Sequence, residues 1–354
     1  MAVVTWDGSS STAYSTAANW DTGSVPADGD DVVIPDTSSI NACNVDSNDS
    51  CNSLTVLSNG EIGSDNGSKL AILGEADGTG ATTNGFAVNI DGAITDNGGT
   101  SLDIDIRTAA TTTIDLTATS GNVRNLTINH ASANVFYSGV ITLTGNLNIT
   151  LGTLNCSHAS GNFTVQGRTD IGPASGSADQ ATLNATDCNI SLGSGRTSSY
   201  ALIVNQGGTF TGGSGNHTIG SIETKNNSNA KCTLTSGVTT LDAENTSDNL
   251  ALSIEGASTF AHGSGTVTVT SATDTRIRNA GATLALNNLI INHASAVITL
   301  ANNGLTCAGD FTITAGSFST TTNNYALTVT GDCVVGDGAG SADTAVLTGN
   351  ASAI

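Results

Sequence analysis

A nine-residue segment recurs far along this chain, and this internal repeat constrains the fold more than any other feature of the sequence. Positions 125–133 read Asn-Leu-Thr-Ile-Asn-His-Ala-Ser-Ala, and positions 288–296 read Asn-Leu-Ile-Ile-Asn-His-Ala-Ser-Ala, an offset of 163 (288 − 125). Gly-Ser-Ala-Asp at 176–179 returns at 340–343, an offset of 164 (340 − 176). A chain that repeats in this way builds length by stacking similar units rather than by enclosing one pocket.

The repeated segments are written in short stretches of alternating apolar and polar residues. Leu126 and Ile128, Val267 and Val269, and many similar pairs are separated by one polar residue, and Gly, Asn or Ser bound each stretch. This alternation is typical of half-buried β-strands joined by turns. Sustained helical periodicity is lacking, and Thr, Val, Asn and Gly are poor helix formers. The sequence therefore predicts an all-β protein rather than the disordered chain that its composition would also fit.

Strand signals recur at short and fairly even intervals from about residue 39 onward. A second echo links Thr209-Phe210 with Thr259-Phe260, an offset of 50 (259 − 209). The spacing predicts a parallel β-helix with about 20 residues per coil, two or three strands per coil and roughly 16 coils. Antiparallel β-sandwich elements remain the alternative for the first hundred residues, where Asn-Gly and Asp-Gly pairs such as Asn59-Gly60 are typical of hairpin turns.

Residues 1–38 differ from the rest, because they contain both tryptophans, Trp6 and Trp20, and two of the three prolines. We interpret this segment as a cap on the open end of a stacked core. Residues 39–354 are then the β-helix repeat region, and its large repeat covers about 109–190 and 272–354.

The opening segment also resembles a known class of proteins. It reads Trp-Asp-Gly at 6–8, Ala-Ala-Asn-Trp at 17–20, Val-Pro at 25–26 and Val-Val-Ile-Pro at 32–35. This order is similar to the opening of β-helical repeat proteins of bacteria and marine phages, and the later Asn-x-Leu-Thr-Ile repeats resemble those of phage tail-fibre-like proteins and autotransporter-like adhesins. The resemblance implies a right-handed parallel β-helix that serves in attachment or in virion structure. It carries over no catalytic residue.

Charge excludes several classes of partner. The chain has 9 Lys and Arg against 30 Asp and Glu, a formal net charge of −21. A polyanion such as nucleic acid would be repelled, and anionic membrane surfaces are disfavoured for the same reason. No apolar stretch approaches the length of a membrane span. The N-terminus has no basic and apolar signal-peptide pattern, so we expect no secretion signal. A chain built like an extracellular fibre without an export signal suggests a virion protein, which reaches the outside by lysis.

The seven cysteines are scattered and odd in number. Most of them lie in strand-like positions beside Leu, Ile or Val, where a free thiol packs as a small apolar group. We therefore expect buried reduced thiols, although Cys43 and Cys51 are close enough for a local disulfide to remain an alternative.

The sequence offers little support for catalytic or metal-binding residues. Asp28, Asp30 and Asp31 form the densest acidic cluster, but they lack a complete calcium-loop pattern, so a solvated turn is the preferred interpretation. Asp103 and Asp105 share one face of a predicted strand, as a glycan-cleaving pair would require. The five histidines lack metal-binding spacing; they are His130, His158, His217, His262 and His293. The sequence thus predicts no catalytic residue, no metal site, no cofactor and no enzymatic activity.

These observations favour a non-enzymatic structural or adhesive protein of a bacteriophage virion, namely a tail fibre, a spike or a surface decoration. A bacterial surface adhesin or surface-layer rod is the first alternative, and a tail-spike glycan depolymerase is the second. The expected partners are further copies of the chain, with a homotrimer favoured, other virion proteins, or a glycan or protein of the host surface. Because residues 346–354 would end the array without a cap, we expect Val346, Leu347 and Ile354 to be buried, either by further chain beyond Ile354 or in such a contact.

Overall fold

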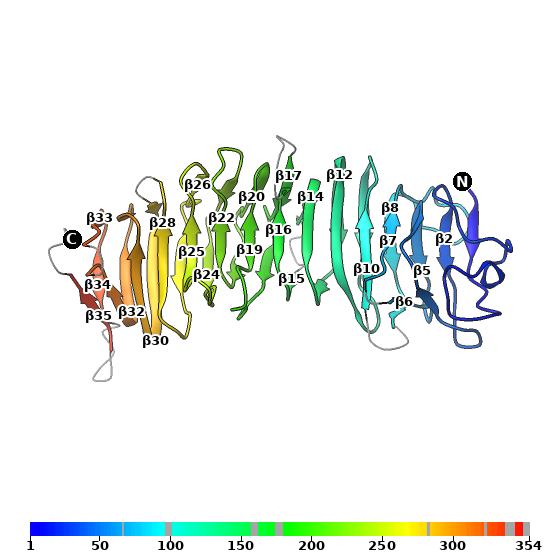
Figure 1. Ribbon diagram of the computed structural model, residues 1–354, viewed down its shortest axis with the longest axis horizontal. Coiled ribbons are helices and arrows are strands. Elements are labelled where there is room, and N and C mark those ends of the chain that lie inside the picture. The colour runs from blue at the N-terminus through cyan, green and yellow to red at the C-terminus, as the bar shows by residue number, and fades with distance from the viewer. Residues whose placement is uncertain are drawn as a thin grey trace. The chain divides into compact units, whose positions relative to one another are not determined.

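The computed structural model describes residues 1–65, 67–95, 101–156, 162–173, 180–281, 284–321, 324–336 and 344–349. Within these residues the one helical element is a turn of 3-10 helix, η1 (Ala17–Asn19). The named strands pair in parallel and stack as a β-solenoid of about 12 turns (Figure 1). The predicted all-β parallel β-helix is thereby confirmed. The chain forms two compact units, Met1–Val165 and Gln166–Ile354.

In the first unit the strands fall into three columns, each of which receives one strand per turn. One column contains β4 (Asp49–Cys51), β7 (Leu70–Ile72), β10 (Ser101–Ile106) and the first parts of β12 (Asn122–Ser138) and β14 (Leu147–Asn155). The next contains β1 (Val3–Thr5), β2 (Asp31–Ile34), β5 (Ser53–Val56), β8 (Phe86–Ile90), β11 (Thr111–Asp115) and the second parts of β12 and β14. The third contains β3 (Cys43–Val45), β6 (Glu61–Ser64) and β9 (Ala93–Ile94), followed by the pair β13 (Ile141–Leu143) and β15 (Asn162–Val165).

The second unit repeats this plan. Its first column contains β16 (Thr169–Ile171), β19 (Leu202–Val204), β22 (Ile222–Thr224), β25 (Leu250–Ile254), β28 (Thr275–Asn279), the second parts of β30 (Asn288–Ala301) and β32 (Phe311–Ser319), and β35 (Val346–Thr348). Its second column contains β17 (Ala181–Asn184), β20 (Gly208–Thr211), β23 (Lys231–Thr233) and β26 (Thr259–Ala261), and then, as a separate sheet, β29 (Leu284–Leu286), β31 (Leu305–Cys307) and β33 (Leu327–Val329). Its third column contains β18 (Asn189–Leu192), β21 (His217–Ile219), β24 (Val238–Leu241), β27 (Thr266–Val269), the first parts of β30 and β32, and β34 (Cys333–Val335).

The shortest turns have the predicted length, and insertions lengthen the others. Leu289 pairs with Phe311, an offset of 22 (311 − 289), whereas Ile222 pairs with Leu252, an offset of 30 (252 − 222). The extra residues form loops at the corners between strands, outside the paired ladder. Such insertions are why the chain makes about 12 turns rather than roughly 16.

The core of each unit consists of inward side chains stacked from turn to turn. Leu126, Ile128, Leu147 and Ile149 in the first unit are fully buried and lie in register across β12 and β14. Burying one such side chain contributes about 1.5–3 kcal/mol. Polar side chains support the corners: Asn125 Oδ1 accepts a hydrogen bond from the next turn's backbone, at Asn146 N, over 2.8 Å.

The two copies of the nine-residue segment adopt the same local structure, one in each unit. The recurring segment lies in β12 and in β30, and both strands bend at the histidine. Gly152 and Gly316, which are offset by 164 (316 − 152), have φ angles of +89° and +90°. A Cβ atom at either position would come within 2.5 Å of the carbonyl oxygen of His130 or His293, so only glycine suits this bend.

Residues 1–38 contribute the first turn as well as an aromatic cluster. Trp6, Tyr14 and Trp20 are buried, and the rings of Trp6 and Tyr14 each meet Trp20 edge-on at centroid distances of 5.0 and 4.8 Å. β1 and β2 of this segment pair with each other, and β2 then pairs with β5.

The Asn59-Gly60 pair near the N-terminus forms a corner instead of a hairpin. Asn59 has a φ of +62°, and Asn59-Gly60 links β5 to β6, which belong to different columns. The antiparallel pairings among the described residues are isolated bridges, Trp6 with Trp20 and Asn245 with Leu250. The described part of the chain therefore gives no support to antiparallel sandwich elements.

Candidate functional site

The predicted carboxylate pair of β10 is held by cations. Leu102, Ile104 and Ile106 point inward as predicted. Asp105 is 1% exposed and lies 3.1 Å from Lys69 Nζ and 2.7 Å from Arg107 Nη2, while Asp103 lies 2.9 Å from Arg124 Nε. Glycoside cleavage needs one carboxyl group that can donate a proton and a second that can attack or activate water. Two carboxylates already paired with cations suit a structural role better.

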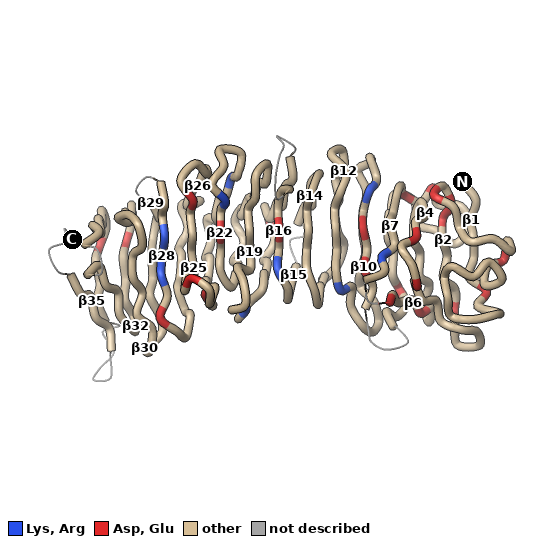
Figure 2. Tube along the Cα trace, viewed as in Figure 1, with Lys and Arg blue, Asp and Glu red and all other residues tan. Residues whose placement is uncertain are grey.

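The acidic cluster at residues 28–31 is divided among separate hydrogen-bond partners. Asp30 accepts hydrogen bonds from the backbone of Ala2 and Ala27, and the buried Asp31 accepts them from Asn52 and Ser53. Asp28 accepts one from Ser50. Among the described residues, no three His, Cys, Asp or Glu side chains are grouped so that they could hold a metal ion. Acidic residues nevertheless dominate this end of the chain, because no Lys or Arg precedes Lys69 (Figure 2).

Several of the histidines form hydrogen bonds with the backbone. His130 and His293 accept a hydrogen bond at Nδ1 from the backbone of Ser132 and Ser295, two positions further along in each copy of the repeat. His217 is buried beside Phe210, and its Nε2 lies 2.6 Å from the Gly212 carbonyl oxygen. Burial lowers the pKa of His217 because it disfavours the charged ring. His158 lies outside the described residues.

All of the cysteines except Cys333 are buried. Cys43 and Cys51 are both unpaired, so the structure does not contain the alternative disulfide. Burial raises the pKa of the Cys232 and Cys307 thiols to about 12. Because the thiolate is the reactive form, these thiols are expected to be inert while the chain is folded.

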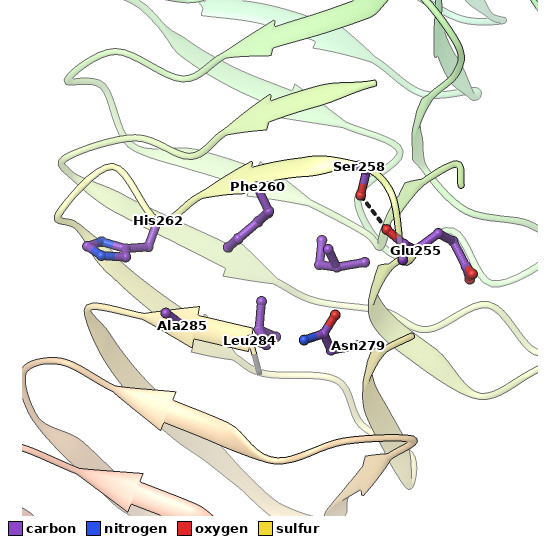
Figure 3. Close-up of a pocket in the computed structure, with 9 residues that line it drawn as sticks. Glu255, Ser258, Phe260, His262, Asn279, Leu284 and Ala285 are labelled. Atoms are coloured by element: carbon purple, nitrogen blue, oxygen red, sulfur yellow. Dashed lines mark hydrogen bonds between the residues drawn. The ribbon is translucent and has the colours of Figure 1, made fainter. Parts of the chain in front are cut away.

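A gap in the second column of the second unit creates a pocket that the sequence analysis did not anticipate. β26 pairs with β23, and β29 pairs with β31, but β26 and β29 belong to different sheets. Between them lies a pocket of about 200 Å³ (Figure 3). Its apolar lining comes from Ile254, Phe260 and Leu284, and its polar lining from Ser258, His262, Asn279 and the backbone of Glu255.

Backbone groups point into this gap from both sides. Alternate residues of a strand in a parallel ladder bond to the same neighbouring strand. Thr259 N donates to Ala230 O, and Ala261 O accepts from Leu234 N, so Phe260 directs its N–H and C=O away from β23. Leu286 O accepts from Ala308 N in the turn of β31, so Ala285 directs its own pair of groups back toward β26.

Two polar side chains line the pocket with donors to spare. Asn279 is 6% exposed, and its Oδ1 accepts a hydrogen bond from Gly281 N. Its Nδ2 has no hydrogen-bond partner among the residues that the structure describes, and Figure 3 shows the amide directed toward Leu284. His262 Nδ1 accepts from Ser264 N, which places the remaining proton of a neutral ring on Nε2.

A second pocket of about 220 Å³ lies beside β28 and is lined by Asn249, Asp274, Thr275, Arg276, Val297 and Thr299. Its charged groups already have partners. Asp274 Oδ1 accepts from Val297 N over 3.0 Å, and Arg276 donates to the Asp248 carbonyl oxygen. This pocket therefore offers less unsatisfied hydrogen-bonding capacity than the gap at β26.

Apolar residues are exposed on the last strands of the second unit. Val334 and Val335 in β34 are 45% and 46% exposed, and Val346 in β35 is 46% exposed. Leu347 is partly exposed, and Ile354 lies outside the described residues. The side chains predicted for a contact are thus accessible at Val346 and in part at Leu347.

Comparisons of the chain with known protein families, with curated protein sequences and with solved structures gave no match. Among the described residues, no helix is long and apolar enough to cross a membrane.

A signal for the gap between β26 and β29 was present in the sequence. The echo of Thr209-Phe210 at Thr259-Phe260 has histidine at position 262 where the first copy has Gly212 (262 − 50).

Proposed function

We propose that this chain is a non-enzymatic structural or adhesive protein of a bacteriophage virion, either a tail fibre, a spike or a surface decoration. The observation that carries the proposal is the parallel stacking of similar turns around an apolar core. Stacked turns give length and a large lateral surface, which are what attachment and scaffolding require. The paired carboxylates Asp103 and Asp105 support the non-enzymatic part of the proposal.

Antibodies raised against the recombinant chain would test the virion assignment. Immunogold labelling of intact phage particles from lysates that contain the protein should decorate one defined part of the particle. If host cell envelopes are labelled and the phage particles are not, the result would contradict the proposal and favour a bacterial adhesin or surface-layer protein. Release of reducing ends from host polysaccharide by the purified chain would favour a depolymerase.

We further propose that the chain associates through the exposed valines of β34 and β35, with a homotrimer as the favoured state and another virion protein as the alternative. Exposed apolar side chains such as these valines favour association. Light scattering should give the mass of an oligomer for the unmodified chain and a smaller mass for the double variant Val334→Glu and Val335→Glu. An unmodified chain that remains a monomer at micromolar concentration would contradict the homo-oligomer.

A further inference from the structure

We propose that the pocket between β26 and β29 binds the acetamido group of an N-acetylated sugar, such as N-acetylglucosamine or N-acetylgalactosamine. The inference rests on the adhesive form of the proposed function, because it names a class of surface glycan to which such a protein would attach.

Contacts at both ends of the gap limit the ligand to a compact group. At one corner Ala280 N donates a hydrogen bond to Ile254 O over 2.9 Å, and at the other Asn288 N donates to Gly265 O over 3.3 Å. Between these contacts lies the pocket of about 200 Å³. An extended chain that continued past both ends would meet these contacts, whereas a single substituent of a sugar would not.

The apolar floor of the pocket selects a methyl group. Ile254, Phe260 and Leu284 line it, and Figure 3 shows the Phe260 and Leu284 side chains entering from the strands on either side. Burial of an acetyl methyl group against these side chains favours binding. A sugar hydroxyl group at the same place would lose its hydrogen bonds to water without replacement. The floor therefore distinguishes an N-acetylated sugar from its parent hexose.

The polar groups around the floor complement a secondary amide. Phe260 directs its backbone N–H and C=O toward the gap. Asn279 Nδ2 and His262 Nε2 are further donors in the lining. An acetamido group presents one N–H and one C=O, as a peptide group does. Its carbonyl would accept from these donors, and its N–H would donate to the Phe260 carbonyl.

The charge of the lining favours a neutral ligand. Among the described residues that line the pocket there is no Lys or Arg, and the chain as a whole carries a net charge of −21. An anionic ligand is therefore disfavoured. Glu255 contributes its backbone, while its carboxylate is paired with Arg278 and points away from the pocket (Figure 3). No unpaired carboxylate of the lining thus remains to attract a cation.

Saturation-transfer difference NMR with the full chain tests the proposal. The probes are N-acetylglucosamine and N-acetylgalactosamine, each compared with its parent hexose, glucose or galactose. We expect at least one acetamido sugar to bind with a dissociation constant of about 1–10 mM, as suits a ligand of this size. The acetyl methyl protons should receive the strongest saturation, and the parent hexoses should bind at least about tenfold more weakly.

Variants of the full chain locate the site. Asn279→Ala should weaken binding about fivefold, because it removes one donor to the acetamido carbonyl. Thr306→Ala, on the outward face of β31, should leave binding unchanged. Circular dichroism checks that each variant is folded, and His262→Ala, with an expected weakening of about threefold, replaces Asn279→Ala if that variant unfolds.

Three results would overturn the proposal. They are failure of both acetamido sugars to bind the folded chain, equal binding of the parent hexoses, and unchanged binding in the folded pocket variants. The test is separate from the labelling of phage particles. Labelled particles together with a chain that binds no acetamido sugar would refute the pocket assignment alone, whereas sugar binding by a chain that labels only host envelopes would refute the virion assignment alone.

Discussion

Two strands of the second unit carry the same short sequence and lie in different surroundings. Thr209-Phe210 in β20 and Thr259-Phe260 in β26 are each followed by Gly-Ser-Gly at the same spacing. Phe210 is fully buried, and its strand β20 is paired with β23 of the following turn. Phe260 is half-buried, because β26 has no such partner toward β29. Since the local sequence is shared, the difference must arise from the fit of the following turn.

Position 212 and its counterpart 262 give a physical reason for the difference. A Cβ atom added to Gly212 would lie 2.5 Å from Thr235 N, so the next turn approaches the backbone there as closely as glycine alone allows. Gly212 N donates to Thr233 O at the same place. In the second copy His262 occupies this position, and β29 of the following turn does not pair with β26. A side chain at the corner thus keeps apart two strands whose own sequences would pair.

Amide hydrogen exchange should show the largest contrast between the two strands. Phe210 directs its N–H toward β23, in continuation of the bond from Gly212, whereas the N–H of Phe260 faces the gap. We expect the Phe260 amide to exchange at least about 10³-fold faster than that of Phe210, because exchange of a ladder amide requires local unfolding. Fragmentation mass spectrometry can resolve the two sites. Equal protection would show that β26 and β29 pair in solution.

Truncation of the two phenylalanines should have unequal costs. Phe210→Ala should lower the free energy of unfolding by about 3–5 kcal/mol, because it leaves a cavity in a closed wall. Phe260→Ala should cost about 1 kcal/mol or less, because its ring already borders a pocket. Urea unfolding of the chain, compared at constant m-value, measures both changes. Similar losses for the two variants would mean that the gap is filled in solution.

The corner positions provide a smaller and sharper comparison. Gly212→Ala should destabilise the chain by about 1–3 kcal/mol, since the new methyl group collides with the backbone of Thr235. His262→Ala should change stability by about 0.5 kcal/mol or less, because the side chain stands at an open corner. If Gly212→Ala proves neutral, close approach at this corner is not what separates the two strands.

The pH dependence of the free energy of unfolding should depend on His217, which packs beside Phe210 of β20, more than on His262, which follows β26. Burial lowers the pKa of His217, so the unfolded chain binds a proton at this residue more readily than the folded chain does. The stabilising contribution is therefore present above the ordinary histidine pKa of about 6.5 and is lost as the pH falls from there through the lower folded pKa. His217→Gln should flatten the decline in unfolding free energy below pH 6.5, with His262→Gln as the matched control. An unchanged decline in the His217 variant would contradict this assignment.

Much of the fold was predictable because the relevant signal is local. Alternation with a period of two assigns each residue of a strand to one face, and Leu126, Ile128, Val267 and Val269 are all buried as their spacing predicts. The repeat predicted stacking and the spacing predicted the shortest turns, since each turn must meet its neighbour in register. The parallel all-β solenoid and the burial of the cysteines other than Cys333 follow from the same reasoning.

The tertiary structure alone decided which neighbours each residue meets. Asp103 and Asp105 occupy predictable faces, but their partner cations Lys69 and Arg124 come from neighbouring turns. Asn59-Gly60 could close a hairpin or turn a corner, and the stacking of β5 and β6 on other turns selects the corner. The gap beside Phe260 likewise depends on how the following turn fits against His262. Pattern within a strand is set by the pleat of its own backbone, whereas pairing between turns is set by loops and side chains remote in sequence, which no local periodicity records.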